Sequence, residues 1–94
     1  MAIKSFSHKG LEKFFLTGSK AGIQAQQASR LSRQLAALNV ATHPQQMNVP
    51  GWDFHYHKGG SFAGHYAVSV NGNWRVTFKF EGADAVEVNY VDYH

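Results

Sequence analysis

Residues 66–78 read YAVSVNGNWRVTF, in which two runs of alternating apolar and polar side chains flank a turn-forming Asn-Gly-Asn. Alternation with a period of two is typical of strands that bury one face, and Asn and Gly favour a tight turn. A two-residue turn would place Val68 opposite Arg75 and mix the two faces. A three-residue turn instead gives one wholly apolar face, so we predict an antiparallel hairpin in that register. Its cross-strand pairs would be Val70 with Trp74, Val68 with Val76, and Tyr66 with Phe78.

The other face of this hairpin collects the small and polar side chains. In the same register it receives His65, Ala67, Ser69, Arg75, Thr77 and Lys79. Antiparallel sheets commonly leave one face in water. An open polar face that bears Arg75, beside a loop that bears Lys58, is therefore where we expect the functional residues.

A short strand and a first helix are expected before the hairpin. The strand covers residues 2–6. Ser7 would then cap the helix and Gly18 would end it, with Phe6 and Leu11 forming a hydrophobic staple. The apolar stripe of this helix would be Leu11, Phe14 and Phe15.

A second, longer helix is expected over residues 24–41, because apolar side chains recur there at three- and four-residue spacing. They are Ala28, Leu31, Leu35 and Leu38. Arg30, Arg33 and Gln34 fall largely outside this stripe, and for the two arginines a solvated face is favoured over contact with an acidic partner.

Further strands are expected over residues 52–57 and 85–91. The order of elements then predicts an α+β fold with a short N-terminal strand. Two helices would pack on one face of a mostly antiparallel sheet of about four to five strands.

The composition fits one small globular domain, which we expect to span residues 1–94. The chain has no cysteine, which excludes disulfides, thiolate metal sites and cysteine nucleophiles. No apolar run approaches the roughly 20 residues that span a bilayer, and the first residues lack a signal-peptide core. We therefore expect a cytoplasmic protein without membrane contact. A net charge of +3 is a mild bias toward polyanions such as RNA.

Two groups of side chains have the chemistry of a catalytic or metal site. Asp92-Tyr93-His94 ends the chain with an acid, a phenol and an imidazole, although a terminal tail is usually frayed. His55 and His57 alternate along an expected strand and would share a face. His65 or His94 could complete a metal site with them, but neither cysteine nor a suitably spaced carboxylate accompanies them. We therefore expect no metal and no other cofactor.

Two cationic side chains have a possible role in binding phosphate. Arg75 lies in mid-strand on the polar face, where its guanidinium could grip a phosphate with two donors. The alternative is a surface arginine that packs its stem against its neighbours. Lys58 lies in a loop from which it could reach solvent or a phosphate.

Together these motifs resemble the HigB-type toxins, also called plasmid-maintenance killer proteins, of the RelE/ParE superfamily. The resemblance spans nearly the whole chain, and its most specific parts are the strand motif Asn-x-x-Trp-Arg and the terminal Asp-Tyr-His. The matching stretches are residues 3–6, 8–11, 54–55, 58–59, 70–78 and 91–94. Three features depart from the family pattern. The family usually has a leucine at the position of His57. It often has charged residues after Lys-Gly, where this chain has residues 60–63, Gly-Ser-Phe-Ala, and the loop is about one residue longer here.

The resemblance implies a RelE-like fold and an endoribonuclease, or mRNA interferase, that inhibits translation by cutting mRNA in the A site of the 30S ribosomal subunit, next to rRNA. It also implies a cognate HigA-type helix-turn-helix antitoxin. The catalytic residues carried over from the family are His55, Lys58, Arg75, Asp92, Tyr93 and His94. The RNA-binding residues expected are Lys58, Arg75 and Lys79. The competing hypothesis is a ParE-type toxin that inhibits DNA gyrase by binding alone, and a toxin that has lost its activity is a third.

Metal-free RNA cleavage by the ribose 2′-OH needs a base, an acid and cations around the phosphate. Histidine suits either proton role because its ordinary pKa is about 6.5. The hypothesis assigns proton transfer to His55 and His94, without deciding which is the acid. Arg75 and Lys58 would stabilise charge. Asp92 would act as a base or orient a histidine, and Tyr93 would stack on a base or bond a phosphate.

Overall fold

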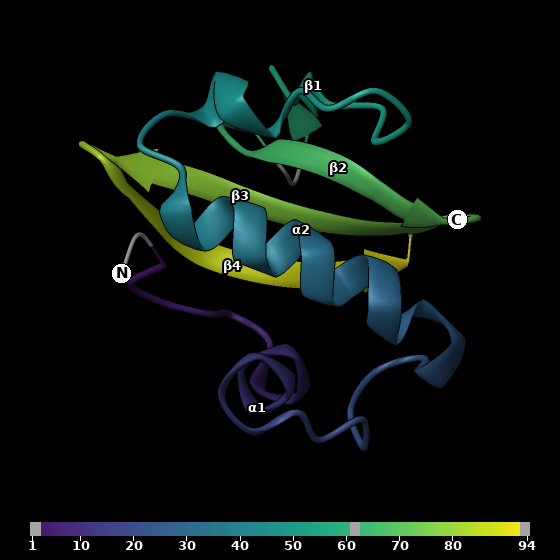
Figure 1. The fold of residues 1–94 in the computed structure, drawn as a ribbon. Helices are drawn as coiled ribbons and strands as arrows, with labels where there is room; N and C mark the ends of the chain where they lie inside the picture. Colours follow the sequence, from purple (N-terminus) through teal and green to yellow (C-terminus); the bar gives the residue numbers. More distant parts are fainter. Residues whose placement is uncertain (1–2, 61–62, 93–94) are drawn as a thin grey trace.

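The sheet holds four antiparallel strands in the order β1-β2-β3-β4, so that each strand pairs with its neighbour in the chain (Figure 1). The computed structural model describes residues 3–60 and 63–92. Its strands are β1 (His55–Tyr56), β2 (Tyr66–Asn71), β3 (Trp74–Glu81) and β4 (Asp84–Asp92). Its helices are α1 (Lys9–Thr17) and α2 (Ala28–Val40), and the 3-10 turns η1 (Ala25–Gln27) and η2 (Pro44–Met47) lie on either side of α2. The predicted α+β fold class is confirmed.

The β2–β3 hairpin buries one apolar face against the helices, as predicted. Val68 lies opposite Val76, and Tyr66 lies opposite Phe78. Val68, Val76 and Phe78 are fully buried there, whereas Tyr66 is half-buried at the start of β2. The hydrophobic pattern therefore fixes the register, because a slip by one residue would expose this whole set.

The turn of the hairpin differs from the prediction. Trp74 pairs with Asn71 and not with Val70, which falls in a bulge between Ser69 and Asn71. Gly72 has a φ of 57°, in the left-handed region that a tight two-residue turn requires. The bulge adds the residue that this shorter turn omits, so the register of the remaining pairs is unchanged.

β1 is shorter than the strand expected over residues 52–57. The backbone turns before it, because the N–H of Trp52 donates to the carbonyl of Val49 at 3.0 Å and Asp53 has a left-handed φ of 50°. β4 contains a second bulge, at which Glu87 also has a left-handed φ, of 52°. The hydrophobic pattern of the sequence does not predict either the turn before β1 or the bulge in β4.

The segment before α1 runs parallel to β4 along the edge of the sheet. Ile3 and Phe6 form isolated bridges with Ala85 and Val88. The N–H of Ser7 also donates to the carbonyl of Val88 at 2.8 Å. The expected strand over residues 2–6 is thus present only as bridges, and its first residue lies outside the described residues.

His8, and not Ser7, caps α1. Its Nδ1 accepts the N–H of Leu11 at 3.0 Å. The predicted Ser7 cap and the Phe6–Leu11 staple are therefore wrong, because the backbone of Ser7 is still bonded to β4 and the helix begins later. Gly18 ends α1 as predicted, with a φ of 81°.

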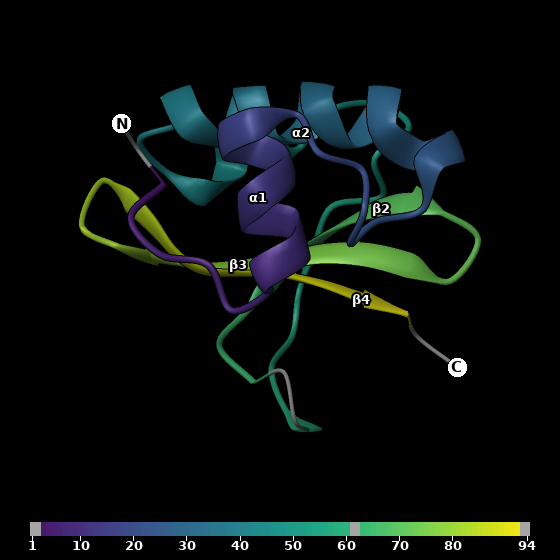
Figure 2. The same ribbon diagram turned by 90° about the horizontal axis from the view of Figure 1, so that it is seen from below.

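Both helices cover the same face of the sheet (Figure 2). Their buried apolar side chains join those of the hairpin in one core, and the predicted stripe of α2 is confirmed. The buried helical residues of this core are Leu11, Phe14, Ala28, Leu31, Leu35 and Leu38. Within residues 3–60 and 63–92, no helix is long and apolar enough to cross a membrane.

Two polar side chains of α2 bond the sheet, and the solvated face predicted for the arginines is wrong at Arg30. Gln34 is fully buried and donates from Nε2 to the carbonyl of Ser69 at 2.7 Å. Arg30 is half-buried and donates from Nε to the same oxygen at 3.3 Å and from Nη2 to the carbonyl of Gly51 at 2.6 Å. Arg33 is exposed, as predicted. The bulge at Val70 interrupts the ladder beside Ser69, where α2 supplies these donors.

Gly10 and Gly22 bring the start of α1 against the segment that leads to α2. A Cβ on Gly22 would lie 2.5 Å from the Cα of Gly10. Both partners in this contact are backbone, so no side-chain rotation can relieve it.

Gly22→Ala should therefore destabilise the protein by about 1–3 kcal/mol, the usual range for overpacking. The free energy of unfolding in urea measures the effect. Gly59→Ala is the matched control, because a Cβ there meets nothing within 4 Å. Equal stability of the two variants would contradict the close backbone contact.

Candidate functional site

Alternate residues of the four strands lie on the sheet face that the helices leave uncovered. Directly paired residues of antiparallel strands point to the same side. One row across this polar face is His55, Ala67, Thr77 and Asn89, and the next is Ser69, Arg75 and Val91. His55 and Arg75 are two strands and two residues apart, which places their Cα atoms about 12 Å from each other. Both side chains therefore lie on the uncovered face, in neighbouring rows.

The centre of this polar face is not open, contrary to the prediction. Ala67 and Thr77 are fully buried although no helix covers them. Both are small, so the longer side chains around them shield them from water. Within residues 3–60 and 63–92, no group hydrogen-bonds the buried Oγ1 of Thr77.

The backbone of the hairpin turn holds the guanidinium of Arg75. Its Nη1 donates to the carbonyl oxygens of Gly72 at 2.8 Å and Trp74 at 3.0 Å. The side chain is half-buried. Arg75 is thus a positioned cation at one end of the polar face and not a loosely solvated surface arginine.

The imidazole of His55 contacts the chain just before β1. Its Nδ1 lies 3.0 Å from the carbonyl oxygen of Asp53. A carbonyl only accepts, so Nδ1 carries the hydrogen in this contact and Nε2 is the nitrogen that can exchange a proton with a ligand. The left-handed backbone of Asp53 aims that carbonyl.

His57 and His65 extend the polar face beside His55. The ring centroids of His55 and His57 are 4.8 Å apart, which confirms that these two residues share a face. The N–H of His57 donates to the carbonyl of His65 at 2.9 Å. Partial burial, and then the charges of His55 and His65, lower the pKa of His57 below its ordinary value. Among the described residues, no group of three or more His, Asp or Glu side chains could hold a metal ion.

Lys58 is exposed in the connection between β1 and β2, which projects from the sheet on the side away from the helices (Figure 2). Lys79 lies on β3, with its ammonium nitrogen 3.7 Å from a carboxylate oxygen of Glu87. Both side chains of that pair are partly exposed, and such pairs are weak, so Lys79 can still exchange this partner for a phosphate. Lys79 shares the face of Thr77 and His55, because it lies two residues after Thr77 on β3. Both lysines are therefore on the side of the sheet that bears His55.

Asp92 is the last described residue, and it pairs with Trp74. Alternate residues of a strand face opposite sides, so the register assigns Asp92 to the side of Trp74 and not to that of Arg75. His55, Lys58 and Arg75 thus lie on the side of the sheet that the helices leave uncovered, and Asp92 lies at the end of β4. The predicted site residues Tyr93 and His94 lie outside the described residues.

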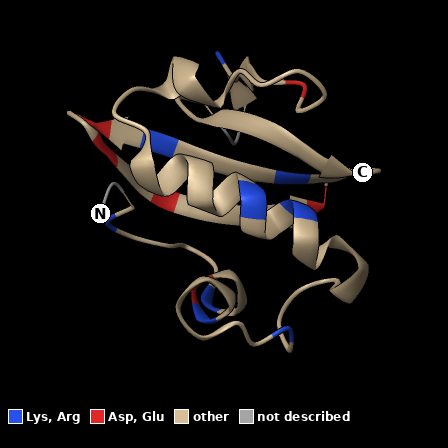
Figure 3. Ribbon diagram, viewed as in Figure 1, with Lys and Arg blue, Asp and Glu red and all other residues tan. Residues whose placement is uncertain are grey.

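Acidic residues lie both at this site and away from it. Asp53 contacts His55 through its carbonyl, and Asp92 at the end of β4 pairs with Trp74, the neighbour of Arg75. Glu81, Asp84 and Glu87 lie toward the turn between β3 and β4, where Figure 3 shows acidic residues on both strands. Acidic residues therefore lie at both ends of this hairpin.

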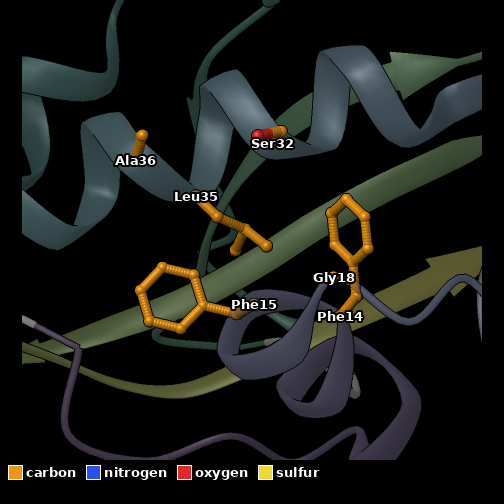
Figure 4. A pocket seen from close by; sticks show the side chains of 6 residues that line it. All are labelled: Phe14, Phe15, Gly18, Ser32, Leu35 and Ala36. Carbon is orange, nitrogen blue, oxygen red and sulfur yellow. The ribbon is translucent and has the colours of Figure 1, made fainter.

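A pocket of about 300 Å³ opens between the two helices (Figure 4). It lies among Phe14, Phe15 and Gly18 of the first helical segment and Ser32, Leu35 and Ala36 of α2. This lining is mainly apolar and belongs to the helical layer. It offers none of the groups that phosphate chemistry needs.

Sequence reasoning missed how Asp53 and His57 surround His55. His57 was considered only as a metal ligand, and Asp53 was not considered. The alternation of His55 and His57 did place both rings on one face. Nothing in the pattern signals a carbonyl contact, because it depends on the left-handed backbone of Asp53.

Two comparisons relate the chain to known proteins. Residues 4–94 match the family model described as the RelE-like toxin of type II toxin-antitoxin system HigB. The chain is also similar to a protein named endoribonuclease HigB from Proteus vulgaris. The two are 40% identical over 92 residues, which cover 98% of this chain and 99% of that protein.

The buried hydroxyl of Thr77 gives a test of the polar face. Thr77→Val keeps the side-chain shape and removes a buried polar atom that lacks a hydrogen bond in the described structure. The free energy of unfolding should therefore rise by about 1 kcal/mol. The reverse exchange on the next residue, Val76→Thr, should lower it, because it buries a hydroxyl among apolar side chains. A loss of stability in Thr77→Val would show that the hydroxyl is bonded.

The lowered pKa of His57 predicts how stability depends on pH. The unfolded chain binds a proton at this histidine more readily than the folded protein does, so folding weakens as the pH falls below about 6.5. His57→Phe removes this contribution. The loss of stability between about pH 7.5 and about pH 5.5 should be smaller in the variant than in the wild type. Tyr56→Phe, a neighbouring change without titration in this range, should behave as the wild type. An equal or larger loss in His57→Phe would contradict the prediction.

Proposed function

The chain belongs to the HigB-like toxins, which are RelE-like toxins of type II toxin–antitoxin systems, and we propose that it is an endoribonuclease that cuts mRNA on the ribosome. One observation carries the proposal. His55 and Arg75 lie on one face of the sheet, in a chain 40% identical to a protein named endoribonuclease HigB. An imidazole and a positioned guanidinium are the groups that metal-free phosphodiester cleavage uses.

The proposed reaction is an attack of the ribose 2′-OH on the adjacent phosphorus. A base takes the proton of the 2′-OH, and the new O2′–P bond forms while the P–O5′ bond breaks. An acid gives a proton to the departing O5′. The products are a 2′,3′-cyclic phosphate and a 5′-hydroxyl end.

His55 is suited to one of the two proton transfers. Its Nδ1 is directed at the carbonyl of Asp53, so Nε2 can take up or release the proton at the RNA. Arg75 is suited to the negative charge that builds on the phosphate, because its guanidinium is already held by two carbonyls and needs little reorganisation. Lys58 adds a mobile cation from the loop.

Asp92, Tyr93 and His94 complete the proposed site on the basis of the family resemblance. His94 would be the second proton-transfer group, and Tyr93 would stack on a base or bond a phosphate. Asp92 would orient a histidine from the end of β4. The register of Asp92 favours this supporting role over direct contact with the phosphate that Arg75 binds.

We also propose the two partners. As a toxin of a toxin–antitoxin system the chain has an antitoxin, and a HigA-type helix-turn-helix protein fits the family. The substrate would be mRNA in the ribosomal A site. A net charge of +3 neutralises few phosphates, which suits an enzyme that receives its RNA held by the ribosome. We place the activity in the cytoplasm, where translation occurs.

Reporter mRNA in a translating extract tests the function. Arg75→Ala and His55→Ala should each reduce the cleavage rate by about a hundredfold or more, because each removes a group that acts in the transition state. Arg33→Ala is the matched control, since it removes an exposed arginine from α2. Cutting at the wild-type rate by both site variants would refute the assignment. Intact mRNA together with damaged DNA in cells that express the wild type would favour the gyrase-directed alternative.

A further inference from the structure

His57 is held beside His55, although the proposed reaction gives it no role. Its backbone is fixed on both sides, because its N–H donates to the carbonyl of His65 and its own carbonyl accepts the N–H of Gly64, both at 2.9 Å. The rings of His55 and His57 meet at 66° with centroids 4.8 Å apart. This is the edge-to-face arrangement that aromatic rings favour.

His57 meets His55 as a neutral ring near neutral pH. Partial burial and the charges of His55 and His65 lower the pKa of His57, so the neutral imidazole is its main form near neutral pH. Among the described residues, the titratable and cationic groups on its side of the sheet are His55 on β1, Lys58 in the following loop, His65 just before β2, and Arg75 and Lys79 on β3. Lys79 is itself paired with Glu87 on β4. A second positive charge next to His55 is therefore avoided.

The hydrogen bond from His55 to Asp53 does not by itself fix the imidazole. The bond between Cβ and the ring has a broad torsional preference, so an imidazole on the surface rotates easily. A half-turn of the ring would place Cδ2 where Nδ1 was and Cε1 where Nε2 was, so the hydrogen bond to Asp53 would be lost and Nε2 would move. A second contact, from the ring of His57 two residues further along the chain, restricts this rotation.

We propose that His57 is a positioning residue for His55, and that packing of its ring keeps His55 in the orientation in which Nδ1 bonds Asp53 and Nε2 meets the RNA. The catalytic part of this inference rests on the proposed ribonuclease function. The orientation of His55 is a property of the protein alone and can be measured without RNA.

The kinetic experiment compares variants with and without a ring at position 57. His57→Leu and His57→Gln should lower the maximal rate of reporter mRNA cleavage by on the order of tenfold, with little change in the toxin concentration that gives half of this rate. His57→Phe keeps a flat ring and should restore most of the rate at about pH 7.5. Tyr56→Phe is the matched control on the other side of β1 and should cut as the wild type does. Thermal unfolding identifies any variant that fails to fold, and either ringless variant then suffices.

A second readout follows the nitrogen atoms of His55 by ¹⁵N NMR of the purified proteins. The wild type and His57→Phe should show His55 with its hydrogen on Nδ1. His57→Leu and His57→Gln should shift the population toward hydrogen on Nε2, because the ring can then leave Asp53. A role in stability alone would not move this signal.

The outcomes separate the two proposals. Wild-type cleavage and an unchanged His55 tautomer in the ringless variants would overturn the positioning role. So would a His57→Phe variant as slow as His57→Leu, because the imidazole itself would then be required. If the wild type cuts no mRNA but the tautomer depends on position 57, the ribonuclease proposal fails and the orientation of His55 by His57 stands.

Discussion

The bulge at Val70 interrupts the β2–β3 ladder beside the carbonyl of Ser69, and the side chains of Gln34 and Arg30 both donate to this oxygen. These two hydrogen bonds join the helical layer to the sheet at the carbonyl of Ser69. It fixes where α2 lies along the sheet, and it belongs to the hairpin whose register decides which side chains face the helices. The positions of Arg75, Thr77 and Ala67 on the other face follow from the same register. The position of α2 and the set of side chains on the polar face therefore both depend on the backbone of the bulged β2–β3 hairpin.

The hydrophobic alternation of the sequence was sufficient to predict that register. Val68 and Val76 had to share a buried face, and only one pairing achieved this. The same logic could not reveal the bulge, because a two-residue turn with a bulge and a three-residue turn give the same pairs for Val68 and Tyr66. Burial of Gln34 was equally hidden, since its partner is a carbonyl that only the bulge makes accessible. The cap of α1 was misplaced because backbone bonds to β4 hold Ser7 in the edge of the sheet.

The candidate site shows the same division between pattern and backbone geometry. His55 and Arg75 could be placed on one face by counting along strands. The contacts that make them useful come from irregular backbone: the left-handed Asp53 presents a carbonyl to His55, and the turn at Gly72 presents one to Arg75. The hydrophobic pattern predicts which side chains are buried, but it does not predict the direction of a carbonyl group. Sequence reasoning could therefore name these residues without showing how they are held.

The stack of Trp74 on Tyr90 makes this end of the sheet visible to spectroscopy. The two ring centroids are 4.4 Å apart, and Trp74 directly precedes Arg75 and pairs with Asp92. Burial raises the pKa of Tyr90, so its phenol stays protonated and donates to Gln27 in the helical layer. The chain has only one other tryptophan and no cysteine that could carry a thiol-reactive dye. The indole of Trp74 is thus a built-in fluorophore beside Arg75, and its emission reports any rearrangement where β3 begins and β4 ends.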